Sequence, residues 1–155
     1  MGGLWTDFGT GIAYQLVPDD PLVDNTQCGL DSALMAKIGT NSIRVYHVDP
    51  SLDHDDCMKT FADAGIYIWL DLDTFDTQIG QDKPQWNQTQ LDRFSAVMDT
   101  FHKYDNLGGF FVGNEVLTTG MSSQCPTKHV LIMYRQWLRR RTLCQGRRPR
   151  PQSLP

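Results

Sequence analysis

Residues 42–73 read SIRVYHVDPSLDHDDCMKTFADAGIYIWLDLD, and this stretch decides the fold. Its first seven residues are rich in β-branched and aromatic side chains and predict a strand. Asp53 is a suitable N-cap for a helix whose apolar residues recur at helical spacing, and Gly65 is a suitable stop for it. Residues 66–70 are apolar or aromatic and predict a second strand. The stretch therefore forms a strand–helix–strand unit of the kind that places two strands in parallel.

The same alternation continues on both sides of this unit. Towards the N-terminus, residues 30–38 show helical spacing before Gly39, and residues 8–14 contain a short apolar run. Towards the C-terminus, residues 89–104 place an apolar face on a long helix, and residues 107–113 predict a further strand. The apolar residues that predict the first helix are Leu30, Ala33, Leu34 and Ile38.

Two architectures have this alternation, an open doubly wound sheet and a (β/α)8 barrel. The sequence has no G-x-G-x-x-G after the first strand and no P-loop lysine motif, which such a nucleotide-binding sheet would carry. Polar residues instead follow the predicted strands: Gln15, Tyr46, Asp49, Asp71, Asp73, Asn114 and Glu115. In a barrel these strand ends form the active-site face. A whole barrel takes about 250 residues, so we expect an α/β fold that is the first half, about four βα units, of a (β/α)8 TIM barrel.

Charge is divided unevenly along the 155 residues. Residues 135–155 hold seven of the 14 Lys and Arg and no acid, whereas residues 1–134 hold the other seven against all 18 Asp and Glu, a formal charge of −11. Such a body would not attract nucleic acid or anionic lipid, and it suits a neutral ligand. We expect residues 1–119 to form the partial barrel domain and residues 120–155 an irregular, disordered Arg/Pro-rich tail. The alternative for the tail is a nucleic-acid or membrane arm.

Targeting and metal-binding signals are missing from the sequence. No run approaches the ~20 apolar residues of a membrane span, and the N-terminus lacks the basic start and apolar core of a signal peptide. The cysteines and histidines show no metal spacing, so we expect neither a metal nor a cofactor. An even number of cysteines permits disulfides in a secreted protein, and buried free thiols are the alternative. The cysteines are Cys28, Cys57, Cys125 and Cys144.

The only glutamate of the chain, Glu115, follows Asn114 at the end of the apolar run 107–113. A glutamate in this place is typical of the proton donor of a barrel glycosidase, and apolar neighbours should raise its pKa by desolvation. Retaining glycoside chemistry needs a second carboxyl group about 5–5.5 Å away. The alternative is that Glu115 caps the next helix or pairs with Arg44.

Five ordered blocks resemble one enzyme family. They are GIAYQ (11–15), DPLVDNTQC (20–28), IGTNSIRVYHVDP (38–50), HDDCMKTFADAGIYIWLDL (54–72) and LGGFFVGNEV (107–116). Over roughly residues 9–119 the chain resembles the fungal β-1,3-glucanosyltransferases of glycoside hydrolase family 72, GPI-anchored enzymes that cut and rejoin cell-wall β-1,3-glucan. The resemblance implies β-1,3-glucan as partner and a secreted, membrane-anchored location at the cell wall.

The resemblance also implies roles for individual residues. Glu115 matches the acid/base, Asn114 the residue that holds the sugar 2-hydroxyl, and Gln15, Tyr46 and Asp71 match donor-subsite positions. Cys28 and Cys57 match a disulfide pair. The sequon at Asn87 is consistent with glycosylation, and capping of the next helix is its alternative. Two further interpretations stay open. Tyr46, Trp69 and Trp86 stack on sugars or are structural aromatics, with Trp69 expected in the core. Asp73, where the family usually has a small polar residue, points the same way as Asp71 along the strand or is a solvated acid of the loop.

The sequence departs from the family in its second catalytic group. The family takes its nucleophile, a second glutamate, from the seventh strand of the barrel, and neither Asp49 nor Asp71 matches that position. We therefore expect a chain truncated before the nucleophile and inactive in covalent transfer. Residues 121–144 differ from the family's continuation, which we interpret as a shifted reading frame or an unrecognised intron. The alternative function is a non-catalytic glucan-binding or vestigial half barrel, and its open sheet edges predict non-specific self-association.

Overall fold

Strands and helices alternate in the computed structural model, which describes residues 10–16, 19–74, 76–79 and 87–114. The described elements are β1 (Gly11–Tyr14), α1 (Asn25–Lys37), β2 (Ser42–Val45), α2 (Asp55–Asp63), β3 (Tyr67–Asp71), α3 (Gln88–Phe101) and β4 (Leu107–Phe111). Their order is the predicted one. Gly39 and Gly65 follow α1 and α2 with φ of 75° and 73°, the left-handed conformation that makes glycine a helix stop.

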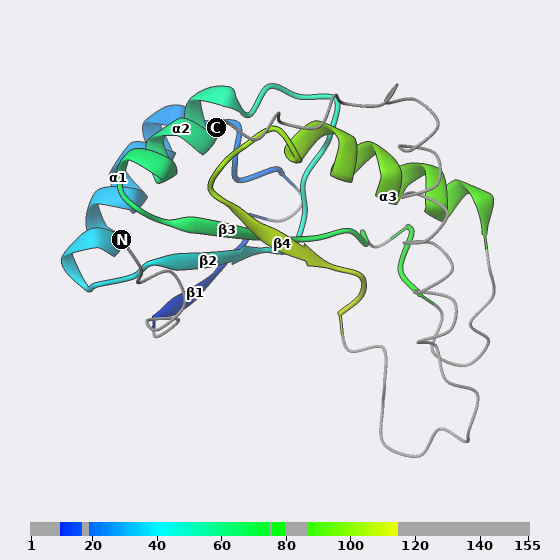
Figure 1. Cartoon of the computed structure of the whole chain (residues 1–155), viewed down its shortest axis with the longest axis horizontal. Coiled ribbons are helices and arrows are strands. Elements are labelled where there is room, and N and C mark those ends of the chain that lie inside the picture. Colours follow the sequence, from blue (N-terminus) through cyan, green and yellow to red (C-terminus); the bar gives the residue numbers. More distant parts are fainter. Residues whose placement is uncertain (1–9, 17–18, 75, 80–86, 115–155) are drawn as a thin grey trace, which may run out of the picture.

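The sheet is parallel and its described strands lie in chain order, β1-β2-β3-β4. Arg44 of β2 is in register with Ala13 of β1 and with Trp69 of β3. The three described helices all lie on one face of this sheet (Figure 1). A doubly wound sheet reverses its strand order and has helices on both faces. In a barrel the strands follow the order of the chain and the helices lie on one face. The predicted fold class, four βα units of a TIM barrel, is confirmed.

The hydrophobic core fills the space between the sheet and the helices. Alternate residues of β2 and β3 point into it, as the period of two along a strand requires. They are Ile43, Val45, Ile68 and Leu70, and they meet Phe61 of α2 and Phe94 and Phe101 of α3, all at most 1% exposed. The intervening residues, including Arg44 and Trp69, therefore face the other side of the sheet.

Helix α1 buries a different face from the one its sequence indicates. Leu30, Leu34 and Ile38 are 64%, 59% and 60% exposed, and the buried residues of α1 are Cys28, Ser32 and Met35. Apolar spacing predicts a helix correctly, but it does not specify which neighbour covers the apolar stripe. This helix follows β1, which lies at one edge of the described sheet.

Asn87 is the N-cap of α3, which was one of its two predicted roles. Its Oδ1 accepts a hydrogen bond of 2.8 Å from the backbone N–H of Thr89. Its side-chain nitrogen, the atom that glycosylation would modify, takes no part in that bond, so the cap and the predicted modification are compatible. Within the described part of the chain, no helix has the length and apolar character needed to cross a membrane. The predicted tail, residues 120–155, lies outside the described residues.

A disulfide joins α1 to α2, which confirms the predicted pairing of Cys28 with Cys57. The two Cα atoms are 5.6 Å apart and both residues are at most 1% exposed. The bond closes a loop over a sequence separation of 29 residues that contains β2. It therefore holds together the two helices that flank the second strand.

We expect the free energy of unfolding of the Cys28→Ser/Cys57→Ser variant to be about 3 kcal/mol lower than that of the oxidised protein, because loop closure no longer restricts the unfolded chain. Urea unfolding with and without a thiol reductant measures this. The Cys125→Ser/Cys144→Ser variant is the matched control. The reductant should lower its stability as much as it lowers that of the unmodified chain. Equal stability of the oxidised protein and the Cys28/Cys57 variant would contradict the prediction.

Candidate functional site

A polar hollow of about 200 Å³ lies where the described strands end. Each of the four strands contributes a residue from its carboxyl end or from the segment that follows it. The lining residues are Gln15, Tyr46, His47, Asp71, Asp73, Thr74, Gln78 and Asn114. In a barrel this is the face where active sites form.

Four residues that the sequence assigned to substrate binding meet in this hollow: Gln15, Tyr46, Asp71 and Asn114. They come from four different strand ends and are up to 99 positions apart in sequence. Glu115, the predicted acid/base, is the next residue after Asn114 but lies outside the described residues. The structure thus brings the predicted binding residues together, and their roles stay predictions.

A bidentate ion pair joins Arg44 of β2 to Asp71, which lines the hollow. Arg44 Nε donates to Asp71 Oδ1 at 2.8 Å, and Arg44 Nη2 donates to Asp71 Oδ2 at 2.6 Å. The side chain of Asp71 is 1% exposed and that of Arg44 is 29% exposed. The hydrogen bonds to Asp71 raise the pKa of Arg44, so the guanidinium keeps its charge here. A buried carboxylate in this place needs such a partner, because an unpaired one would lose its hydration without compensation.

The Arg44 guanidinium also contacts Asn114 and two aromatic rings. Its Nη2 donates to Asn114 Oδ1 at 3.1 Å, and its Cζ lies 4.4 Å from the ring centroid of Tyr46 and 4.5 Å from that of Phe111. The bond to Oδ1 orients the Asn114 amide so that its NH₂ group is on the side away from Arg44. Arg44 therefore sets the geometry of two predicted substrate-binding residues.

Sequence reasoning missed this role of Arg44. It named Arg44 only as an alternative partner of Glu115, whereas the structure pairs it with Asp71. A signal was present, because Arg44 alternates with the core residues Ile43 and Val45 and so belongs on the same face of the sheet as Asp71. An arginine on that face beside a strand-end aspartate is a strong candidate for an ion pair.

Trp69 lies on the face of the sheet opposite the helices, so its predicted place in the core is wrong. It is half-buried and its ring centroid is 5.9 Å from that of Phe111. A Cβ at Gly108 would come 2.6 Å from Trp69 Cε2, and one at Gly109 would come 2.9 Å from Cζ3. The glycine pair of β4 therefore makes room for the indole. Trp86, the other tryptophan considered for sugar stacking, lies outside the described residues.

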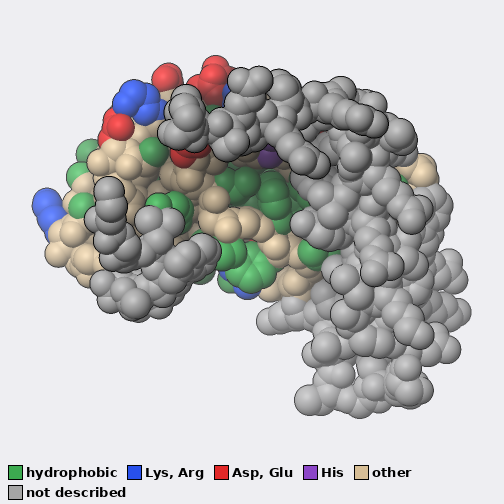
Figure 2. All heavy atoms as spheres, in the orientation of Figure 1, with side chains coloured by type: hydrophobic (Ala, Val, Ile, Leu, Met, Phe, Trp, Pro, Cys, Tyr) green, Lys and Arg blue, Asp and Glu red, His purple; other side chains and the backbone are tan. Residues whose placement is uncertain are grey.

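This face forms a groove of about 300 Å³ with Arg44, Tyr46, Trp69 and Phe111 among its lining residues. Figure 2 shows hydrophobic side chains exposed in the middle of the molecule, over the strands. Phe111 is 39% exposed there. The apolar groove adjoins the polar hollow, because Tyr46 lines both and because Arg44, which lines the groove, is paired with Asp71 of the hollow.

Asp73 is buried, which corrects the interpretation of this residue as a solvated acid. It is 8% exposed, and its Oδ2 accepts a hydrogen bond of 3.2 Å from the backbone N–H of Asn114. Burial raises the pKa of the Asp73 carboxyl, and the negative charge of Asp71 raises it further. The hydrogen bond from Asn114 lowers this pKa, but by less than burial raises it. The folded protein thus holds this proton more tightly than the unfolded chain does. The resulting stability is fully present below the unfolded pKa, about 3.9, and is lost as the pH rises through the folded pKa.

The segment after β3 is held in place by its own hydrogen bonds. The backbone N–H of Thr74 donates to Thr77 Oγ1 at 3.0 Å, and Gln90 Nε2 of α3 donates to the Thr77 carbonyl at 2.6 Å. This attachment to α3 positions Thr74 and Gln78 at the rim of the hollow. The sequence did not indicate a role for Thr74 or Gln78, since a polar loop has the same composition whether or not it lines a site.

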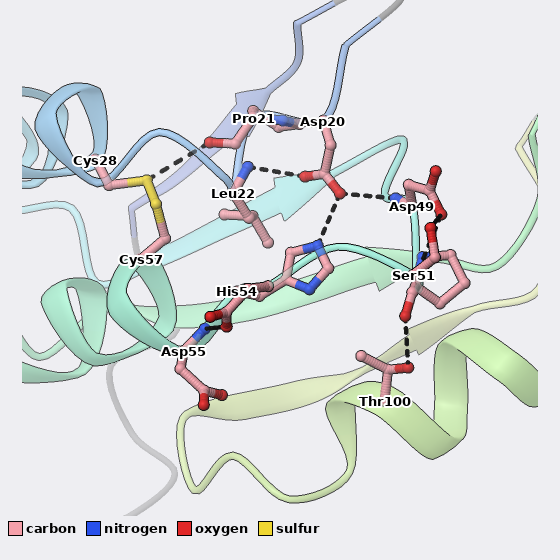
Figure 3. Close-up of polar contacts among 12 residues, drawn as sticks. Asp20, Pro21, Leu22, Cys28, Asp49, Ser51, His54, Asp55, Cys57 and Thr100 are labelled. Atoms are coloured by element: carbon pink, nitrogen blue, oxygen red, sulfur yellow. Dashed lines mark hydrogen bonds and ion pairs between the residues drawn. A yellow bond between two sulfur atoms is a disulfide. The ribbon is translucent and has the colours of Figure 1, made fainter.

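A buried network fixes the loops after β1 and β2 (Figure 3). Asp20 Oδ2 lies 2.8 Å from His54 Nε2 and accepts the backbone N–H of Asp49 at 2.7 Å, while its Oδ1 accepts that of Leu22 at 2.8 Å. The Asp20 and His54 side chains are at most 1% exposed. Asp49 itself accepts from the backbone and hydroxyl of Ser51, bonds that lower the pKa of Asp49. Its carboxylate is thus part of a turn and does not line the hollow.

A parallel sheet with helices on one face and a polar hollow at its strand ends is the architecture of a (β/α)8-barrel enzyme. Within that class, the model of the glucanosyltransferase family, glycoside hydrolase family 72, matches residues 7–143. The chain belongs to this family, as its sequence predicted.

Individual relatives agree with this assignment. The 1,3-beta-glucanosyltransferase gas2 of Schizosaccharomyces pombe is 42% identical over 123 residues, which are 73% of this chain and 27% of that protein. The 1,3-beta-glucanosyltransferase gel1 of Aspergillus fumigatus is 42% identical over 126 residues, 79% of this chain and 28% of that protein. The structure of Saccharomyces cerevisiae Gas2p in complex with laminaripentaose matches with a TM-score of 0.75 at 33% identity, covering 82% of this chain and 31% of that one.

The chain spans less than a third of the length of these relatives. The family match also runs beyond residue 119, where the sequence predicted that the barrel domain ends. The division into residues 1–119 and 120–155 stays a prediction.

Proposed function

We propose that the chain binds β-1,3-glucan in the polar hollow and carries the acid/base half of a glucanosyltransferase site. One observation supports this above the others: Gln15, Tyr46, Asp71 and Asn114, which match the family's substrate-binding positions, line a single hollow. Solved structures of the related Gas2p contain laminari-oligosaccharides. A hollow lined by amides, hydroxyls and the carboxyl groups of Asp71 and Asp73 in an acidic chain suits a neutral sugar better than an anion.

In the proposed chemistry, Glu115 protonates the leaving sugar oxygen and later accepts the proton of the incoming hydroxyl. Asn114 binds the sugar 2-hydroxyl through its amide, which Arg44 orients. Gln15, Tyr46 and Asp71 bind the donor sugars. Both oxygens of Asp71 already accept from Arg44, but each keeps a second lone pair for a sugar hydroxyl.

We further propose that these 155 residues alone bind glucan without transferring it. A covalent glycosyl intermediate requires a carboxylate nucleophile opposite the acid/base, and the sequence contains one glutamate. Asp71 is engaged with Arg44 and Asp49 is engaged in its own turn. The alternative, a vestigial half barrel without glucan affinity, predicts that the hollow stays empty in the presence of laminari-oligosaccharides.

Location and modification follow from the same family assignment. We propose that the protein acts outside the cell at the cell wall, where the Cys28–Cys57 disulfide is stable. GPI anchoring and glycosylation at Asn87 belong to this proposal, and the exposed position of Asn87 suits an added glycan.

Titration of the chain with laminaripentaose by calorimetry, combined with mass analysis of the products, tests the proposed function. We expect binding, and no product longer than the donor. Asn114→Ala should weaken binding by a few-fold up to about tenfold, the effect of losing one hydrogen bond, and Lys59→Gln on the exposed side of α2 should not. Failure to bind at any concentration would exclude glucan binding, and elongated products would show that transfer needs no second glutamate.

We also propose weak self-association of the chain. Leu30 and Leu34 of α1 and Ile38 at its C-cap are exposed, and exposed apolar residues at helical spacing favour association. The edge strand β1 offers a second place for pairing. Sedimentation at rising concentration should show species larger than a monomer, and the Leu30→Gln/Leu34→Gln variant should reduce them. A monomer at all concentrations would contradict the proposal.

A further inference from the structure

Asp73 is a buried carboxyl group in the hollow, and it forms no ion pair with any residue that the structure describes. Arg44, the described cation that acts on Asp73, is already engaged by both oxygens of Asp71. Asp73 receives the backbone N–H of Asn114 at 3.2 Å, and it lines the hollow together with Thr74 and Gln78. The charged groups that act on it are Asp71 from β3 and Arg44 from β2.

A structural role does not account for a carboxylate in this position. A neutral asparagine or serine oxygen would accept the same hydrogen bond from Asn114 without the desolvation of a charge. The rise of the Asp73 pKa shows that burial and Asp71 together outweigh the stabilisation that this bond and Arg44 provide. Groups that are kept in unfavourable surroundings in this way are characteristic of functional sites.

The other lining residues identify the chemistry of the missing partner. Gln15, Gln78, Asn114 and Thr74 provide amide and hydroxyl groups, which both donate and accept hydrogen bonds. Such a lining fits a ligand with several hydroxyl groups and no net charge. A carboxylate adds a strong acceptor, since hydrogen bonds to a charged group are roughly twice as strong as those between neutral groups.

We propose that Asp73 is a sugar-binding residue whose carboxylate accepts hydrogen bonds from hydroxyl groups of a glucan unit bound in the hollow. This inference rests on the proposed function and adds to it a contact that neither the sequence motifs nor the predicted site residues include. It assigns Asp73 to ligand recognition and not to proton transfer.

The proposal makes glucan binding depend on pH. Sugar hydroxyls donate to the ionised carboxylate, so binding favours ionisation and releases a proton when the free chain holds Asp73 protonated. Affinity should therefore increase as the pH rises through the pKa of Asp73. Asp71, His47 and Glu115 are other titratable groups in or next to the hollow.

The test uses a parent chain with Glu115→Gln, which removes the titration of Glu115. It compares this parent with two chains derived from it, one with Asp73→Asn and one with Asp63→Asn. Asp63 is an exposed acid of α2 paired with Lys59, so its variant makes the same charge change outside the hollow. Calorimetric titration with laminaripentaose from pH 4 to 8 gives the affinity. Buffers of different ionisation enthalpy give the protons released.

We expect the parent and the Asp63 variant to bind more tightly as the pH rises and to release protons. The Asp73→Asn chain should bind roughly tenfold more weakly at pH 7, and its affinity should depend less on pH than that of the parent, because both chains keep Asp71 and His47. In the absence of sugar, Asp73→Asn should also raise the unfolding midpoint at pH 7, because it removes a buried charge, whereas a purely structural carboxylate would lower it. Asp73→Ser serves as a second variant if the asparagine chain does not fold.

Two results would overturn the inference in different ways. If the parent binds laminaripentaose and the Asp73 variants bind with the same affinity and pH profile, the contact with Asp73 is wrong while the proposed function stands. If the parent binds at no pH, the proposed function fails and the inference fails with it.

Discussion

The bidentate contact between Arg44 and Asp71 is the constraint on which the rest of the site depends. It joins β2 to β3 on the face of the sheet away from the helices, and the same guanidinium contacts Asn114, Tyr46 and Phe111. One side chain thus fixes groups from three strands. Burial of Asp71 makes the contact obligatory, because removing one partner of a buried pair typically costs about 3–5 kcal/mol.

The acids at the ends of β2 and β3 and just after them differ because their surroundings differ. Asp71 is paired with a guanidinium and Asp49 is stabilised as an anion by Ser51. Asp73 is desolvated and has no ion pair within the described part of the chain. Three aspartates within 25 residues therefore have a structural, a turn-forming and a proposed ligand-binding role. Environments that separate the pKa values of neighbouring acids are a common property of glycoside-processing sites.

Much of the fold follows from the sequence because it depends on local patterns. Apolar runs, helical spacing and the stops at Gly39 and Gly65 predict the order of the elements, and parallel strands then gather Gln15, Tyr46, Asp71 and Asn114 at one edge. The failures concern contacts between distant residues. Local spacing does not determine which elements become neighbours. Three features depend on this: the exposed face of α1, the pairing of Arg44 with Asp71 and the burial of Asp73 under Asn114.

A double-mutant cycle on Arg44 and Asp71 tests the central claim most directly, with unfolding free energy and laminaripentaose affinity measured for each chain. We predict that Arg44→Met and Asp71→Leu each destabilise the fold by about 3 kcal/mol and weaken binding at least tenfold. The double variant should be more stable than the sum of the single effects implies, because neither charge is left unpaired. Additive losses of stability, or single variants that bind laminaripentaose as tightly as the unmodified chain, would contradict the account.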